Sequence, residues 1–195
     1  MAIFLKRSVF IHIPKCGGRW VKKMIEDHIP EFSYSGDPVY DAHDRPATPH
    51  HTPFCFVREP AMLAHSLWHH RARKKQNTRG HQFNWQDDVR LERECQSKDY
   101  LQFMLNVANN QNAVSDYFMD YIDPYENILV GKLENIGADL ITFLQLGDEV
   151  ADYAKIQECS YWKVGQGPQD DAIDPHVRAA INRANEEFSA KFGYV

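Results

Sequence analysis

An early apolar run that ends in a glycine turn and passes into a helical pattern limits the fold more than any other segment. Residues 8–13 (Ser-Val-Phe-Ile-His-Ile) are typical of a buried strand, and Pro14 ends the run. Gly17 and Gly18 then lead into residues 19–25, in which apolar side chains recur at helical spacing. The segment therefore predicts a strand, a glycine turn and a helix in direct succession.

The same alternation continues along the chain. Further strands are predicted at residues 31–35, 54–57 and 127–131, and helices at residues 60–75, 85–109, 113–121, 136–144 and 174–192. Pro60 suits the first position of its helix, and Asp174 suits the N-cap of the last one. Strands separated by helices favour a parallel sheet that is covered on both faces. We therefore predict an α/β fold: a three-layer, P-loop-like domain with a short parallel sheet flanked by helices.

The composition is that of one globular domain. The chain has 195 residues, of which 43% are hydrophobic and 25% charged, so we expect a single domain over residues 1–195. No apolar run reaches the roughly 18–20 residues that span a bilayer, so no membrane span is expected. Residues 1–13 do not resemble a signal peptide, and the four cysteines are scattered without zinc-site spacing. We expect reduced thiols, a cytoplasmic location and no bound metal.

Charge is distributed unevenly along the chain. Residues 1–80 carry 13 Lys and Arg against 7 Asp and Glu, whereas residues 81–195 carry 9 against 20. This split argues against a protein that coats nucleic acid. It favours a local site at which basic side chains of the first part hold an anion.

The glycine turn has the composition of a phosphate cradle. Lys15, Gly17 and Gly18 stand between the predicted strand and the start of the helix, where free backbone N–H groups and the helix dipole attract anions. The spacing does not fit the GxxxxGK[ST] motif of nucleotide triphosphatases. An ATP- or GTP-dependent kinase therefore stays open only as the weaker alternative to the enzyme class considered next.

The segment Ile-Pro-Lys-Cys-Gly-Gly resembles the 5'-phosphosulfate loop of sulfotransferases that use 3'-phosphoadenosine 5'-phosphosulfate (PAPS), in their carbohydrate-type branch. Residues 56–60 (Phe-Val-Arg-Glu-Pro), followed by Ser66, resemble the 3'-phosphate element of that family. Residues 130–136 with 143–144, and the closing residues 192–194, are also similar to family segments. The resemblance covers nearly the whole chain.

The resemblance implies roles for individual residues. Arg58 and Ser66 would bind the 3'-phosphate, and Lys163, in a glycine-containing loop at residues 161–167, would lie near the nucleotide. The 5'-phosphosulfate would be bound by Lys15, Cys16, Gly17, Gly18, Arg19 and Trp20. Arg19 and Cys16 depart from the family, which usually has Thr or Ser at these places. An alternative role for Arg58 is a surface ion pair with Glu59 or Asp44.

Sulfuryl transfer needs a cation at the leaving phosphate and a base for the acceptor hydroxyl. Lys15 suits the first task. For the second, the stretch between the glycine turn and residue 54 offers His28, His43, His50 and His51, with Asp37, Asp41 and Asp44 as carboxylate alternatives. We favour His43, because neighbouring carboxylates could orient its ring and because family members carry a base histidine in this stretch.

We therefore predict a cytoplasmic sulfotransferase that uses PAPS as donor, releases adenosine 3',5'-bisphosphate and needs no metal. The acceptor would be a small molecule or a glycan, and the sequence leaves the oligomeric state open. Besides the kinase, the other alternative is a module without catalytic activity that binds a nucleotide or a sulfated ligand.

Overall fold

The computed structural model describes residues 2–36, 46–48, 50–72, 85, 89–159 and 173–194. The chain divides into two compact units. The first comprises Met1–Arg58 and Asp120–Gln166, and the second comprises Glu59–Met119 and Gly167–Val195. A single domain over residues 1–195 stays a prediction, and each unit is described by itself.

The first unit contains a five-stranded sheet with the strand order β3-β1-β2-β4-β5. The strands are β1 (Ala2–Phe4), β2 (Ser8–Ile11), β3 (Ser33–Tyr34), β4 (Thr52–Val57) and β5 (Leu129–Lys132). Strand β2 pairs in parallel with β4, and β4 in parallel with β5, but β1 is antiparallel to both β2 and β3. The sheet is therefore mixed, and the prediction of a parallel sheet was wrong at β1. Only a few residues join β1 to β2, and so short a link can connect only antiparallel strands.

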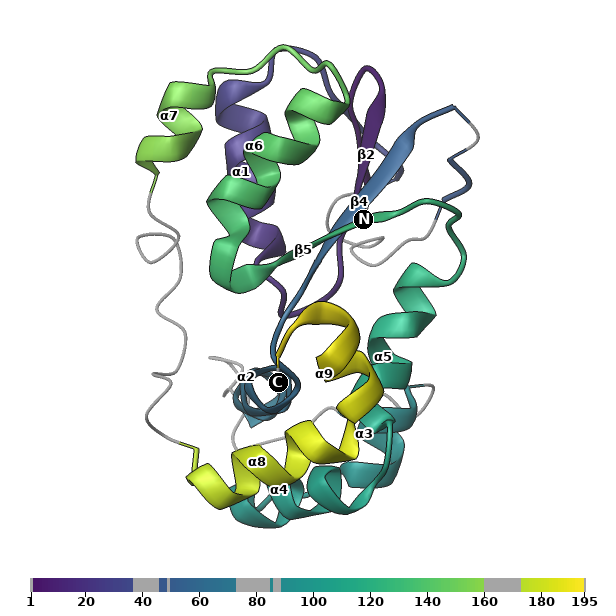
Figure 1. Cartoon of the computed structure of the whole chain (residues 1–195), viewed down its shortest axis with the longest axis vertical. Helices are drawn as coiled ribbons and strands as arrows, with labels where there is room; N and C mark the ends of the chain where they lie inside the picture. The colour runs from purple at the N-terminus through teal and green to yellow at the C-terminus, as the bar shows by residue number, and fades with distance from the viewer. Residues whose placement is uncertain are drawn as a thin grey trace, which may run out of the picture. The chain divides into compact units, whose positions relative to one another are not determined.

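Helices flank this sheet, which confirms the α/β class. They are α1 (Gly18–His28), the 3₁₀ turn η1 (Leu133–Asn135), α6 (Ile136–Leu146) and α7 (Tyr153–Glu158). In Figure 1, α1, α6 and α7 lie together on the left of the strands, and α7 packs against both α1 and α6. The rings of Phe54 and Phe56 on β4 each lie 5.7 Å from the ring of Phe143 on α6. This aromatic contact holds α6 against the sheet.

A buried carboxylate closes the turn between β1 and β2. Glu149 is only 5% exposed, and its oxygens accept hydrogen bonds from the backbone N–H groups of Lys6, Arg7 and Ser8, at 3.1, 2.8 and 2.8 Å. Three donors of one turn thus depend on a single side chain that comes from the segment after α6. Buried donors that lose their acceptor are costly.

We expect Glu149→Ala to lower the free energy of unfolding by about 3 kcal/mol, because it leaves these N–H groups without their charged acceptor. Chemical denaturation measures the loss. The matched control is Arg7→Ala, which keeps the backbone N–H, removes the exposed ion pair with Asp148 and should cost less than about 1 kcal/mol. Equal losses in the two variants would contradict the role given to Glu149.

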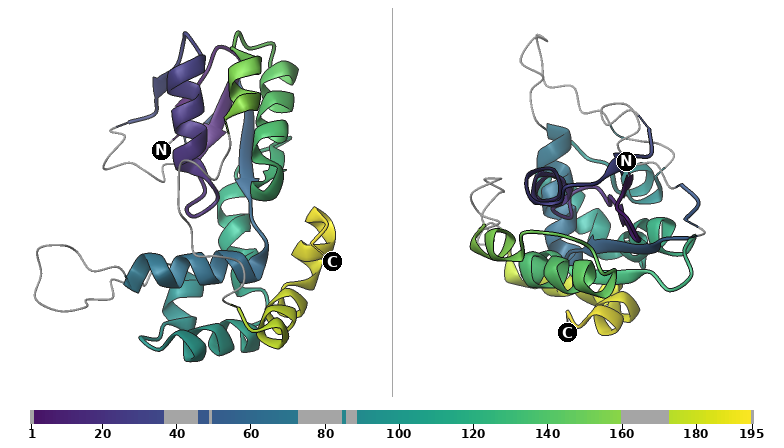
Figure 2. Two further views of the ribbon diagram at one scale, coloured as in Figure 1. Left: turned by 90° about the vertical axis from the view of Figure 1, so that its left-hand side faces the viewer. Right: turned by 90° about the horizontal axis from the view of Figure 1, so that it is seen from above.

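The second unit is helical in its described part. Its helices are α2 (Pro60–Ala72), α3 (Arg90–Cys95), α4 (Tyr100–Asn109), α5 (Ala113–Ile122), α8 (Pro175–Ala184) and α9 (Glu186–Phe192), with the boundary between the units falling inside α5. Helix α8 lies beside α4 and also packs on α2 (Figures 1 and 2). Glu59, just before α2, accepts hydrogen bonds of 2.7 Å from both Arg178 and Asn182 of α8.

Two predicted helices are interrupted. The predicted helix 174–192 breaks at Asn185, whose side chain accepts hydrogen bonds from the N–H groups of Val114 and Ser115 and donates one to the Ile181 carbonyl. The predicted helix 85–109 contains a break between α3 and α4, and Asp99 begins α4 by accepting a hydrogen bond from the Gln102 N–H. Within the described residues, no helix has both the length and the apolar character needed to cross a membrane.

Candidate functional site

The turn between β2 and α1 has an unusual backbone. Lys15 has φ 68° and Gly17 has φ 82°, so both residues are in the left-handed region. Gly17 adopts this conformation readily, whereas it costs a lysine on the order of 1–2 kcal/mol. Strain of this kind in a residue other than glycine is frequent at functional sites. The predicted site lysine is therefore held in a conformation that stability alone would not favour.

The N-terminus of α1 is open to an anion. Gly17 occupies the N-cap and offers no side-chain cap, and the first turn of α1 contains no acidic residue. The first N–H groups of a helix have no partner within the helix, and the dipole gives this end a partial positive charge. Lys15 adds a full positive charge two residues before the cap. The turn therefore has the electrostatic features of an anion-binding loop.

Three charged residues act electrostatically on the buried Cys16 thiol in the middle of this turn. Burial raises the pKa of Cys16, and smaller electrostatic effects come from Arg58, which lowers it, Glu134, which raises it, and Lys15, which lowers it. The thiol therefore stays protonated and neutral at ordinary pH. The positive charge near the turn comes from Lys15 and Arg58, and the neutral thiol does not offset it.

The sheet topology explains why these three charged residues act on the same thiol. Lys15 lies just after β2, Arg58 follows β4 directly, and Glu134 comes two residues after β5. These three strands are parallel neighbours, so their carboxyl ends share one edge of the sheet. Ligands of α/β proteins bind at this edge. The first unit thus brings Lys15 and Arg58 to one edge, as the sequence analysis predicted for an anion site.

The other predicted residues of the turn differ in exposure. The Cys16 and Trp20 side chains are 2% and 1% exposed and belong to the core. Their backbone N–H groups donate to the carbonyls of Ile13 and Gly17, at 3.4 and 2.8 Å, so the turn itself uses the groups by which these two residues could bind a ligand. Arg19 is exposed on the first turn of α1. Gly18 is buried, and a Cβ atom there would overlap the His12 ring. Gly18 is thus required for packing whether or not a nucleotide binds.

Three predicted site residues fall outside the described part of the first unit. Ser66 is 7% exposed and belongs to α2 of the second unit. His43 and Lys163 fall outside the described residues, as do Asp37, Asp41 and Asp44. The roles predicted for them stay predictions.

The structure separates the alternative histidines from the Lys15 turn. His28 ends α1, ten residues and therefore about 15 Å along the helix axis from Gly18. His50 and His51 precede β4, whereas Arg58 follows it, so they lie at the amino edge of the sheet. About 17 Å of strand separates the two ends of β4. None of these three histidines is placed to act as a base next to Lys15.

Sequence analysis did not single out two side chains near the turn. Glu134 acts electrostatically on Cys16, and the His12 ring packs against Gly18. Each of them follows a strand at its carboxyl end, which is the sequence signal that could have identified them. In the described part of the chain, no group of three or more His, Cys, Asp or Glu side chains is arranged to hold a metal ion.

No protein-family model matches the chain, and no curated protein or solved structure matches it.

Proposed function

We propose that this protein is a sulfotransferase that moves the sulfuryl group of PAPS to a hydroxyl of a small-molecule or glycan acceptor. One observation supports the proposal above the others. A strained lysine and an arginine follow two neighbouring parallel strands at one edge of the sheet, and the lysine closely precedes the uncapped N-terminus of α1. This arrangement suits a ligand that carries more than one phosphate or sulfate group. The choice of PAPS rests on the sequence resemblance.

In this proposal the turn acts as a P-loop-like cradle within a three-layer fold. The backbone N–H groups of Gly17, Gly18 and Arg19 bind the 5'-phosphosulfate, and the exposed Arg19 side chain adds a charged contact, whereas the N–H groups of Cys16 and Trp20 donate to carbonyls of the turn itself. Arg58 binds the 3'-phosphate together with Ser66, and Lys163 lies near the nucleotide. We also propose a cytoplasmic location, because all four cysteines are free thiols.

The proposed reaction is one displacement at sulfur. The acceptor oxygen forms a bond to sulfur while the bond from sulfur to the 5'-phosphate oxygen breaks, and adenosine 3',5'-bisphosphate leaves. Lys15 stabilises the negative charge that develops on the leaving oxygen. His43 takes the proton of the acceptor hydroxyl. Adjacent Glu134 and His12 are the other candidates for this proton, because they lie at the same sheet edge as Lys15.

Incubation with PAPS and a panel of hydroxyl acceptors, including unsulfated oligosaccharides, tests the proposal. We expect adenosine 3',5'-bisphosphate to form together with a sulfated product, without added magnesium or ATP. Turnover of ATP with magnesium would show a kinase instead. Tight binding of adenosine 3',5'-bisphosphate without transfer to any acceptor would support a module without catalytic activity.

A further inference from the structure

A cavity of the first unit lies at the opposite edge of the sheet from Lys15. It has a volume of about 690 Å³ and is formed by residues 46–48, 51–53 and 124–127. The first two segments precede or begin β4, and the third precedes β5, so the cavity lies at the amino ends of these parallel strands. Arg58 follows β4 at its other end, about 17 Å along the strand. This cavity is therefore separate from the proposed nucleotide site.

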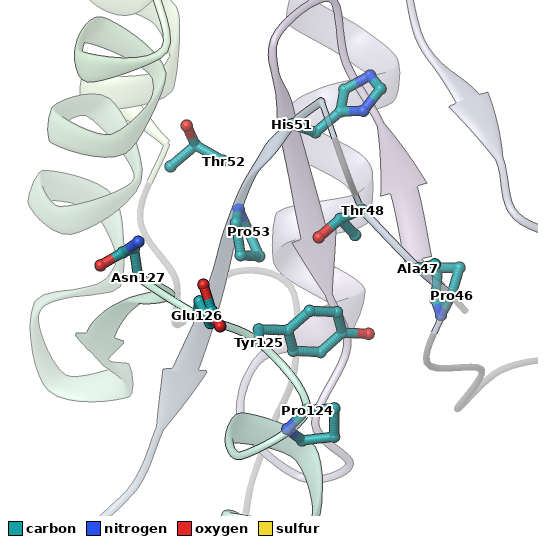
Figure 3. A pocket seen from close by; sticks show the side chains of 10 residues that line it. All are labelled: Pro46, Ala47, Thr48, His51, Thr52, Pro53, Pro124, Tyr125, Glu126 and Asn127. Carbon is teal, nitrogen blue, oxygen red and sulfur yellow. The ribbon is translucent and has the colours of Figure 1, made fainter.

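The cavity combines flat apolar surfaces with uncharged polar groups. Its apolar walls come from three prolines and from Tyr125, which is only 9% exposed and whose ring projects from the 124–127 segment toward the 46–48 segment (Figure 3). Thr48, Thr52, His51 and Asn127 add hydroxyl, imidazole and amide groups around the same space. A ligand here contacts apolar side-chain surfaces and several hydrogen-bonding groups at once.

The charge of the cavity limits the ligand class. Among the described residues that form it, none is Lys or Arg, and Glu126 contributes the one carboxylate. A phosphate, a sulfate or a polyanion would face this carboxylate, and the described lining offers no Lys or Arg to bind it. Glu126 is exposed, so an ion pair with a cationic ligand would add little affinity. The lining favours a neutral, polyhydroxylated ligand.

The polar groups stand on fixed backbone. The Thr52 N–H donates to the Arg7 carbonyl at 2.8 Å, and the His51 ring meets the Phe4 ring edge-on at 5.1 Å. Asn127 has φ 59°, in the left-handed region, which fixes the turn before β5. Groups held in this way lose little conformational freedom when they bind a ligand.

We propose that this cavity binds a neutral saccharide unit. The apolar face of a sugar ring packs on Pro46 and Pro124, beside the largely buried Tyr125, and its hydroxyls exchange hydrogen bonds with Thr48, Thr52, Glu126 and Asn127. This binding does not rest on the proposed sulfotransferase activity. It places a saccharide-binding site at the sheet edge opposite the anion-binding turn.

Saturation-transfer NMR on the full chain tests this site with four probes that differ in charge. N-acetylglucosamine and cellobiose are neutral, glucosamine is a cation and glucuronate is an anion. We expect saturable signals from the neutral probes, with a Kd of about 1–10 mM for so small and polar a ligand. Glucosamine should bind within about twofold of them, because its attraction to exposed Glu126 adds little, and glucuronate should bind at least about fivefold more weakly, because the same carboxylate repels it.

The variants Thr52→Ala and Glu126→Ala should each weaken binding of the neutral probes by about fivefold or more, since each removes hydrogen bonds to the sugar. Both side chains are exposed, so the fold should tolerate the changes, which circular dichroism checks. Glu31→Ala, an exposed change in the same unit outside the cavity, is the matched control and should bind like the wild type. The proposal is overturned if neither neutral probe binds saturably. It is also overturned if glucosamine or glucuronate binds clearly more strongly than the neutral probes, or if the two cavity variants bind like the wild type.

Discussion

Replacing Lys15 by alanine is expected to slow sulfuryl transfer by about 100- to 1,000-fold, the loss typical of removing one group that stabilises developing charge. Lys15 lies at the open N-terminus of α1, where the charge of the leaving phosphate would develop. Binding of adenosine 3',5'-bisphosphate should weaken much less, because interactions made in the transition state act on turnover. Steady-state kinetics gives the turnover, and calorimetry gives the affinity.

The left-handed backbone at Lys15 calls for a second variant. Glycine adopts φ 68° without strain, so Lys15→Gly keeps the backbone of the turn while it removes the whole side chain with its ammonium group. We expect it to lose as much activity as Lys15→Ala and to unfold at the same or a higher temperature. Lys23→Ala is the control, because Lys23 lies on α1 in an exposed pair with Asp27. Near-normal turnover in both Lys15 variants would show that Lys15 has no role in the chemistry.

Loss of His43 is expected to reduce turnover by roughly 100-fold while nucleotide binding stays intact, as when a positioned proton acceptor is removed. Wild-type turnover should also fall as the pH drops through the histidine range near 6.5, because a protonated imidazole cannot accept the proton of the acceptor hydroxyl. His43→Ala should lose this dependence. The pH profile of turnover for both proteins provides the measurement.

The histidines that the structure places elsewhere serve as controls for His43. His28→Ala and His51→Ala change residues at the far end of α1 and at the amino edge of the sheet, and both should keep near-normal turnover. A large loss on Glu134→Gln with normal activity of His43→Ala would assign the base to Glu134. A large loss in either control would contradict the placement of the transfer site at the carboxyl edge.

Most strands of the first unit and the position of its candidate anion site could be predicted from local sequence. Residues 8–13 and 54–57 are apolar runs that end at Pro14 and Arg58, and these become β2 and β4 with the charged residues just past their ends. Parallel pairing then follows from the intervening helix. The sequence thus contains both the strands and the rule that brings Lys15 and Arg58 to one edge.

Features that depend on distant contacts could not be predicted. Strand β1 has three residues, too few for a periodic pattern, and the turn after it is held by Glu149, more than 140 residues away in the sequence. Asn185 breaks the last helix by bonding to the start of α5, which a helical pattern does not reveal. The approach of Glu134 to Cys16 likewise depends on the order of the strands.

The central claim is that the turn after β2 and the end of β4 form a site for a bisphosphorylated nucleotide, and a change at Arg58 tests it. The most direct measurement compares the thermal stabilisation of the protein by adenosine 3',5'-bisphosphate and by AMP. Ligand at about 100 times its Kd should add about 2.7 kcal/mol to the stability. We expect the bisphosphate to stabilise the wild type clearly more than AMP does at equal concentration, and Arg58→Ala to abolish the difference, since a lost charged contact costs about 1.5–3 kcal/mol. Arg7→Ala, an equal charge change at an exposed ion pair of the same unit, should keep the difference. Equal stabilisation of the wild type by both nucleotides, or a difference that persists in Arg58→Ala, would contradict the account.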